Sequence, residues 1–296
     1  HRRRMNTDRS FQTLYLDAMA FSKPWKKTRT VFPTLGKRGR AVSRRAAVLI
    51  LWLVWGAAAP AQFGGEVWPE REAPLPEGAE VLRRVRESFP ETPLRVRAQL
   101  LVRDVRGEIV RTLNAALRLA WRADPPEAQF VVLDAFGDLL AQAVLRRPPD
   151  GQAHWTIYEG DPPVEQTPPR PDEAIAGTSF SWRDLSLDPL WWSDARTVGT
   201  EMRKSRLCFV VEVRPPPHAE GGVARARLLV DSAVFALLEA ETFSAEGRRL
   251  KRLEVKSLKK VGDQWTLQDL EVRDYASRRR TTLRVLESVL EGGAAP

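Results

Sequence analysis

The feature of this sequence that most restricts its fold is a two-residue alternation of apolar and polar side chains, which recurs between residues 94 and 288. In the first run, Leu94, Val96, Ala98 and Leu100 alternate with Arg95, Arg97 and Gln99. Consecutive side chains of a β-strand point to opposite faces, so the pattern predicts strands with one buried and one hydrated face. The longest run, residues 108–122, sets five apolar side chains on one face: Leu113, Ala115, Leu117, Leu119 and Trp121.

Eleven segments are predicted as strands: residues 94–100, 108–122, 129–134, 139–146, 154–158, 207–214, 223–231, 234–242, 248–260, 265–273 and 281–288. Short turns rich in Gly, Asp and Pro separate many of them, which is typical of antiparallel hairpins. Helices do not alternate with these strands, and this argues against a parallel α/β sheet. The sequence therefore predicts a mainly β fold, a curled antiparallel sheet or half-open β-barrel of about eleven strands.

An amphipathic helix is predicted before the first strand, over residues 78–89. Its apolar residues fall on one helical face: Val81, Leu82, Val85 and Phe89. Pro90 ends this helix because proline removes a backbone donor.

A second helical segment is predicted in the middle of the chain, after a proline-rich loop over residues 161–176. Ser181 is followed three residues later by Asp184, the spacing of a capping box at a helix start. We expect a short helical insertion over residues 182–192, interrupted at Asp188-Pro189. The N-terminal helix and this insertion are expected to plug the concave face of the sheet.

The N-terminal residues have the pattern of an export signal. Residues 36–45 carry five positive charges, residues 46–59 are uncharged and apolar, and Ala59-Pro60-Ala61 is a small-residue cleavage pattern. The apolar run has 14 residues, fewer than the roughly 20 of a spanning helix. We therefore expect a cleaved signal peptide and a periplasmic protein that begins at Gln62, with an uncleaved membrane anchor as the alternative.

These patterns divide the chain into four parts. Residues 1–61 are expected to be an N-terminal extension and signal peptide, and residues 62–77 a linker. Residues 78–290 form the predicted β domain, and residues 291–296 a tail.

Composition excludes several classes of function. Residues 1–61 hold 13 Lys or Arg and 2 Asp or Glu, whereas the rest of the chain holds 34 basic and 36 acidic residues. The domain therefore lacks the positive field that nucleic-acid binding needs. The single cysteine, Cys208, excludes a cysteine-rich metal site, and no motif of a nucleophilic or metal-dependent enzyme is present. We expect no enzymatic activity, no catalytic or metal-binding residues and no cofactor.

Tryptophan is concentrated in the predicted insertion, where three of these residues lie within eleven positions. Ordinary core packing explains such a cluster, and so does a mobile aromatic lid over an apolar cavity. Under the second hypothesis the candidate lipid-binding residues are Leu117, Trp121, Trp182, Leu190, Trp191 and Trp192.

The run Gly177-Thr178-Ser179-Phe180-Ser181-Trp182-Arg183-Asp184-Leu185 resembles a segment of the LolA-like outer-membrane lipoprotein-sorting proteins. Further short matches follow in the same order: Arg206-Leu207-Cys208, Val230-Asp231, residues 236–241, residues 248–251 and Thr281-Thr282-Leu283. The resemblance covers about residues 78–290 and is strongest to the uncharacterised branch of that family.

The resemblance implies a half-open barrel whose cavity accepts lipoprotein acyl chains or related lipids and carries them across the periplasm. An inner-membrane donor and an outer-membrane acceptor would then be its partners. No cysteine stands at the predicted cleavage site, which corresponds to the soluble carrier type rather than the lipid-anchored acceptor. The alternative is a non-enzymatic periplasmic module, structural or regulatory, with the same fold and a cavity filled by its own side chains.

Overall fold

The computed structural model describes residues 74–148, 152–159, 164–261 and 264–291. Residues from Leu75 onward belong to one compact unit. The predicted signal peptide and the cleavage site after Ala61 lie outside the described residues.

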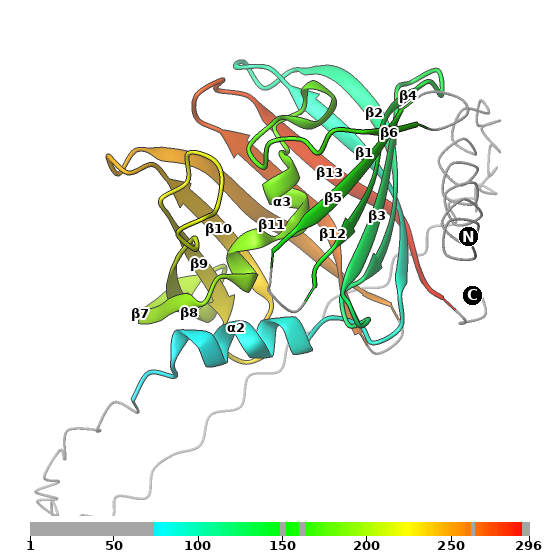
Figure 1. Cartoon of the computed structure of the whole chain (residues 1–296). Coiled ribbons are helices and arrows are strands. Elements are labelled where there is room, and N and C mark those ends of the chain that lie inside the picture. Colours follow the sequence, from blue (N-terminus) through cyan, green and yellow to red (C-terminus); the bar gives the residue numbers. More distant parts are fainter. Residues whose placement is uncertain (1–73, 149–151, 160–163, 262–263, 292–296) are drawn as a thin grey trace, which may run out of the picture. The chain divides into compact units, whose positions relative to one another are not determined.

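A single antiparallel sheet of 13 strands forms the body of the unit (Figure 1). Its spatial order is β6-β5-β4-β3-β2-β1-β13-β12-β11-β10-β9-β8-β7. The strands are β1 (Leu94–Arg103), β2 (Ile109–Ala120), β3 (Glu127–Leu133), β4 (Leu139–Arg146), β5 (His154–Glu159), β6 (Val164–Gln166), β7 (Asp194–Arg203), β8 (Arg206–Arg214), β9 (Arg225–Asp231), β10 (Leu237–Phe243), β11 (Arg249–Val261), β12 (Gln264–Asp274) and β13 (Arg280–Leu290). Strands β6 and β7 do not pair with each other, so the curled sheet is not closed.

The predicted fold class is confirmed, with 13 strands in place of the predicted number of about eleven. The two strands that the prediction lacks are β6 and β7, the two edges of the sheet. All three residues of β6 are exposed, and no residue of β7 is fully buried. An edge strand with no row of buried side chains along one face does not need alternating apolar residues. Hydrophobic periodicity therefore revealed neither β6 nor β7. Residues 161–176 accordingly hold β6 and the start of a 3₁₀ turn rather than loop alone.

Four short helical elements accompany the sheet. They are α2 (Gly78–Glu87), η1 (Ile175–Gly177), α3 (Trp182–Ser186) and η2 (Asp188–Trp191). We call the sheet face that packs against them the inner face, and the opposite one the outer face. Leu187 adopts a left-handed conformation (φ 52°) between α3 and η2, which breaks the insertion next to Asp188-Pro189, as the sequence predicts.

The inner face carries two apolar clusters. The first packs Phe180 and Trp182 of the insertion segment against β1 to β5 and β11 to β13. The second packs α2 and η2 against β8 and β9, through residues such as Val81, Leu190 and Val211. The helical segments therefore fill the inner face instead of leaving an open trough.

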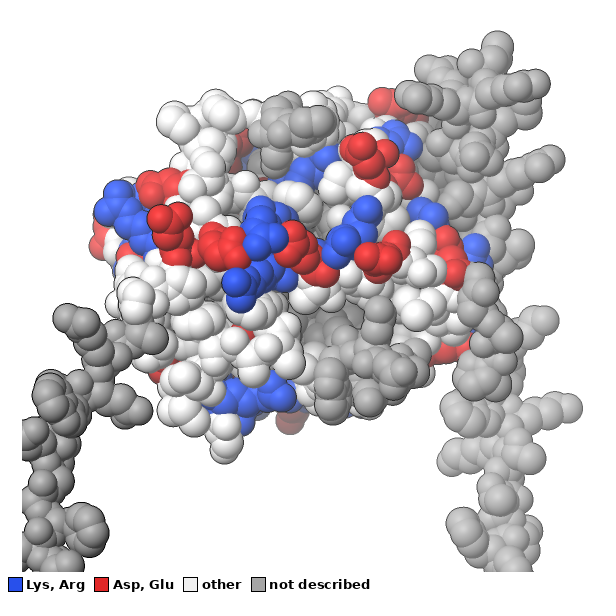
Figure 2. Space-filling model, turned by 90° about the horizontal axis from the view of Figure 1, so that it is seen from below, with Lys and Arg blue, Asp and Glu red and all other residues white. Residues whose placement is uncertain are grey.

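Helix α2 is amphipathic, as the sequence predicts. Its inner residues Val81, Leu82 and Val85 are at most 1% exposed. Its outer side is charged, and Glu80 lies 2.7 Å from both Arg83 and Arg84. Figure 2, which views the unit from the side of α2, shows charges of both signs in a band across this surface. Alternating signs produce no strong field, so this surface is not a binding site for a polyanion.

No helix within the described ranges has the length and apolar character needed to cross a membrane.

Candidate functional site

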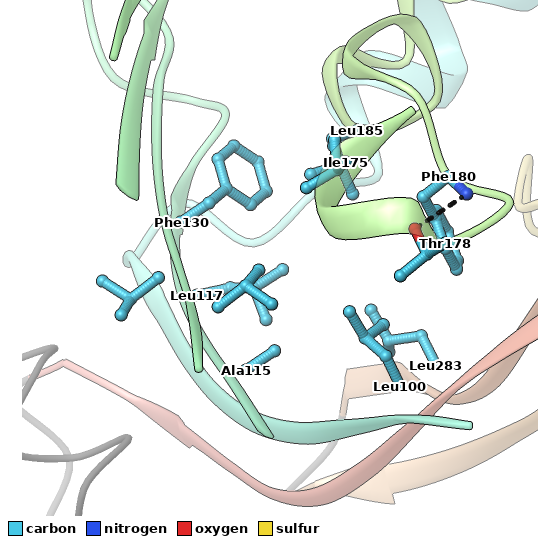
Figure 3. A pocket seen from close by; sticks show the side chains of 11 residues that line it. Leu100, Ala115, Leu117, Phe130, Ile175, Thr178, Phe180, Leu185 and Leu283 are labelled. Atoms are coloured by element: carbon cyan, nitrogen blue, oxygen red, sulfur yellow. Dashed lines mark hydrogen bonds between the residues drawn. The ribbon is translucent and has the colours of Figure 1, made fainter. Parts of the chain in front are cut away.

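The strongest candidate site is a small apolar cavity between the insertion and the inner face of the sheet (Figure 3). Side chains from β1, β2, β3 and β13 form its floor, and side chains from η1, α3 and the segment between them form its roof. The lining residues are Leu100, Ala115, Leu117, Phe130, Val131, Val132, Ile175, Thr178, Phe180, Leu185 and Leu283. Its volume is about 20 Å³, room for about one water molecule, whereas sites for drug-sized ligands span roughly 300–1,000 Å³.

The polar atoms nearest this cavity are already used within the protein. The hydroxyl of Thr178 accepts a hydrogen bond from the backbone N–H of Phe180 at 3.1 Å (Figure 3). The other lining side chains are apolar. The cavity therefore offers dispersion contacts and the exclusion of water, and it has no group for acid–base or nucleophilic chemistry.

A second cavity of about 20 Å³ lies on the other side of the insertion, toward β9, β10 and β11. Its lining combines apolar residues such as Leu190, Leu228 and Leu253 with the charged Asp184 and Lys251. The insertion thus separates two narrow spaces, one apolar and one with a charged border.

The N-terminal end of α3 is fixed by its own sequence and by the sheet. The predicted capping box is confirmed, because the backbone N–H of Ser181 donates to Oδ2 of Asp184 at 2.8 Å while the Ser181 side chain caps the helix. Lys251 of β11 donates to the same Oδ2 at 3.0 Å, and the hydroxyl of Thr281 in β13 accepts from the N–H of Ser179 at 2.9 Å. Two sheet strands therefore hold the start of the insertion.

A buried ion network holds the other end. Oδ1 of Asp188 accepts hydrogen bonds from Arg147 at 2.7 Å and from the hydroxyl of Ser186 at 2.6 Å. Arg183 lies 3.4 Å from the second oxygen of Asp188 and 2.7 Å from Asp172. The side chains of Arg147 and Arg183 are only 2% and 5% exposed. Such charges are stable in a core only while they stay paired, so the network opposes movement of η2.

Trp191 is held between two guanidinium groups. Arg147 stands 4.8 Å and Arg86 5.3 Å from its ring centroid. Arg86 also donates to the backbone oxygen of Leu190 at 2.5 Å. Cation–π contacts of this kind link α2, η2 and the residue that follows β4.

The six predicted lipid-binding residues do not line a single cavity. Leu117 lines the first cavity and Leu190 the second. Trp121, Trp182 and Trp192 are 6–8% exposed in the two core clusters and line neither cavity, and Trp191 is half-buried. Phe130, Ile175, Phe180 and Leu185 line the first cavity and were not among the six predicted residues. Phe130 lies in a predicted strand, but β3 is apolar and buried on both faces, so alternation could not show which of its side chains reach the cavity.

Within the described residues, no group of three or more His, Cys, Asp or Glu side chains could hold a metal ion. Cys208 is buried on the outer face, and burial together with Asp231 raises the pKa of its thiol, which keeps it protonated and unreactive.

Comparisons with known proteins bear on the fold. A model of a family described only as an uncharacterized protein matches residues 161–293. No curated protein matches the sequence. A putative outer-membrane lipoprotein-sorting protein domain from Vibrio parahaemolyticus superposes with a TM-score of 0.62 at 13% identity, over 74% of this chain and 94% of that one.

Two further solved structures are similar. A DUF1329 family protein from Desulfovibrio piger gives a TM-score of 0.61 at 13% identity, over 74% of this chain and 93% of the other. A LolA superfamily protein from Nitrosomonas europaea gives 0.54 at 12% identity, over 75% and 96%. The resemblance to LolA-like proteins seen in the sequence is therefore confirmed at the level of the fold.

Proposed function

We propose that this chain, which has the fold of the LolA-like proteins, is a periplasmic carrier that takes acyl chains between its insertion and the inner face of its sheet. The supporting observation is the pair of apolar surfaces that meet at the first cavity. Leu100, Leu117 and Phe130 face Phe180 and Leu185 there. An acyl chain can replace these contacts without leaving a buried polar group unpaired.

The proposed ligand is a lipid tail because of the energetics of the lining. Removing a methylene group from water stabilises a complex by about 0.8 kcal/mol, so a long saturated chain gains much from an apolar cleft. A polar substrate would lose its hydration at this lining and find no charged side chain in return.

The structure described above corresponds to the empty, closed form under this proposal. A volume of about 20 Å³ holds no acyl chain, so binding requires the insertion to separate from β1, β2 and β3. Polar links restrain the insertion near its two ends, at Asp184 and at Asp188. We propose that cargo enters by separating the apolar surfaces, with an inner-membrane donor and an outer-membrane acceptor driving the exchange.

The small volume also favours a second candidate function. The inner face is filled by side chains of the insertion, as expected for a structural or regulatory module that uses the same fold without cargo. The two candidates differ in whether lipid occupies the protein in the cell.

Native mass spectrometry of the protein purified from the periplasm distinguishes the two candidates. A carrier retains lipid, and titration with a fluorescent fatty-acyl probe gives saturable binding. Ala115→Leu fills the first cavity and is expected to lower the affinity for the probe several-fold, whereas Thr112→Leu, on the outer side of the same strand, leaves it unchanged. Protein that is repeatedly empty and does not bind the probe would exclude the carrier.

A further inference from the structure

Strand β7 is the longer of the two edge strands of the sheet, and it ends the sheet beside β8 (Figure 1). It pairs only with β8 among the strands described, so one side of its ten-residue backbone has no strand partner there, although Gly78 of α2 packs against the backbone of Ala195 and Arg196. An edge of this length is a template for another strand, and proteins usually protect such edges. Two of its apolar side chains are also accessible, Val198 at 54% and Met202 at 62% exposure.

The charged residues of β7 all lie on one face. Glu201 is opposite Cys208, which belongs to the small cluster on the outer face. Arg203, Arg196 and Asp194 are opposite residues of β8 with the same parity as Cys208. The shift of register between Thr197 and Gly199 adds one residue to β7. The charged residues before and after this shift therefore lie on the same face of the sheet, the outer face.

The order of these charges is complementary to itself. When β7 is placed antiparallel to a second β7 about a two-fold axis between Val198 and Gly199, Asp194 stands opposite Arg203 of the partner subunit. Arg196 then stands opposite Glu201 of the partner subunit. All four symmetric contacts then place an acid opposite a base, and directly opposed opposite charges stabilise an antiparallel pair. Within the protomer Glu201 already pairs with Arg227 and Arg203 with Glu239, so the charges of the second copy extend these pairs.

The bulge makes this pairing geometrically consistent. Residues that oppose each other across an antiparallel pair must lie on the same face of the sheet. Without the irregularity at residues 197–199, Asp194 and Arg203 would fall on opposite faces, because nine positions separate them. With it, charge faces charge on the outer face, and Thr197 faces Thr200 of the partner subunit on the inner face.

Gly199 lies at this bulge and beside the proposed two-fold axis. A β-carbon built on Gly199 meets no atom within 4 Å, and Gly199 is not among the residues with positive φ. Neither lack of space nor a positive φ therefore requires a glycine here. A glycine inside a strand often marks a bulge, such as the one at residues 197–199, or the close approach of another backbone, and Gly199 also lies at the two-fold axis.

We propose that the protein forms a symmetric homodimer by antiparallel pairing of β7 with β7 of a second copy, so that the two sheets become continuous. This interface is independent of what the inner face binds. Pairing satisfies the free backbone groups of the edge and places the exposed Val198 and Met202 at the contact.

Sedimentation velocity of the full chain tests the interface with three variants. Arg196→Glu places an acidic side chain opposite Glu201 of the partner subunit at both symmetric contacts. Glu201→Arg places a basic side chain opposite Arg196 of the partner subunit at both contacts. Each variant alone is expected to sediment as a monomer at concentrations where the wild type is a dimer. An equimolar mixture of the two is expected to recover the dimer, because every contact then pairs an acid with a base.

Arg248→Glu is the matched control, since Arg248 is an exposed arginine in the turn between β10 and β11. It changes the net charge equally and is expected to leave the dimer intact. A wild type that is monomeric at all concentrations would overturn the proposal. So would dimers of Arg196→Glu and Glu201→Arg as stable as those of Arg248→Glu, because association would then use another surface.

Discussion

The ammonium group of Lys251 lies 3.0 Å from Oδ2 of Asp184, and this ion pair joins strand β11 to helix α3 across the inner face. The side chains are 16% and 9% exposed, so the pair is largely shielded from water. Lys251 also donates to the backbone oxygen of Ser179 at 3.0 Å. One sheet residue thus holds both the cap of α3 and the segment that leads into it.

Replacing this lysine is expected to loosen the insertion. Lys251→Met keeps much of the apolar stem and removes both hydrogen bonds, which leaves the Asp184 carboxylate without its cation and the Ser179 carbonyl without this donor. The free energy of unfolding should fall by roughly 1–3 kcal/mol, and hydrogen exchange should become faster in α3. Lys256→Met is the control, because Lys256 is 42% exposed and pairs at the surface. Equal exchange rates in the two variants would show that Lys251 does not restrain α3.

The network around Asp188 is expected to contribute more to stability than the pair at Lys251. Asp188→Ala leaves the buried guanidinium of Arg147 without this carboxylate partner, and breaking a buried ion pair from one side typically costs about 3–5 kcal/mol. Urea unfolding followed by circular dichroism measures this loss. Asp138→Ala removes an exposed carboxylate in the turn between β3 and β4 and should change stability by less than about 1 kcal/mol. A similar small change for Asp188→Ala would mean that the network is hydrated.

The sequence predicted those parts of the fold that depend on local patterns. Alternation identified the strands that have a buried row, such as β1 and β2, and helical spacing identified α2. The capping box at Ser181 and the break near Asp188-Pro189 were also found, because each depends on residues within four positions. The edges β6 and β7 were not found, since a strand with no buried row can be recognised only through its neighbour.

The candidate site was predictable only in part, for a related reason. Tryptophan density indicated the insertion, but it could not distinguish a ring that lines a cavity from one that fills a core. Trp182 packs edge-on against Trp155 at 4.9 Å, a contact between residues 27 positions apart that no local pattern encodes. The partners of Asp188 are likewise distant, since Arg147 comes from the end of β4.

A carboxylate on the outer face is expected to make stability depend on pH. Glu239 is 4% exposed, and burial raises its pKa to about 7, although Arg203 and Arg252 lie 2.8 Å away. The folded state then binds the proton more tightly than the unfolded chain, whose glutamate has a pKa near 4.5. The stabilising contribution is complete below pH 4.5 and is lost as the pH rises through about 7.

Glu239→Gln removes this titration while keeping the size of the side chain. Unfolding free energies of the wild type and the variant, measured between pH 4.5 and 8, should therefore differ by an amount that changes with pH in this window. Glu246→Gln, at an exposed turn, is the control and should follow the wild type above pH 5, because hydrogen bonding to Ser244 lowers the pKa of Glu246. Parallel curves for the wild type and Glu239→Gln would contradict the raised pKa.

Replacing Trp121 tests whether the apolar face of the longest predicted strand, residues 108–122, is the buried one. It follows the last residue of β2, is 8% exposed, and packs in the first inner cluster with its ring centroid 6.2 Å from that of Phe89. Trp121→Ala removes a large buried ring and leaves a cavity, so the free energy of unfolding should fall by about 3–5 kcal/mol. Phe136→Ala is a matched aromatic control, because Phe136 is 86% exposed at the turn between β3 and β4, and its loss should cost less than about 0.5 kcal/mol. Denaturant titration of the three proteins decides the matter: a cost below 1 kcal/mol for Trp121→Ala would mean that this ring is hydrated and that the inner face does not extend past the end of β2.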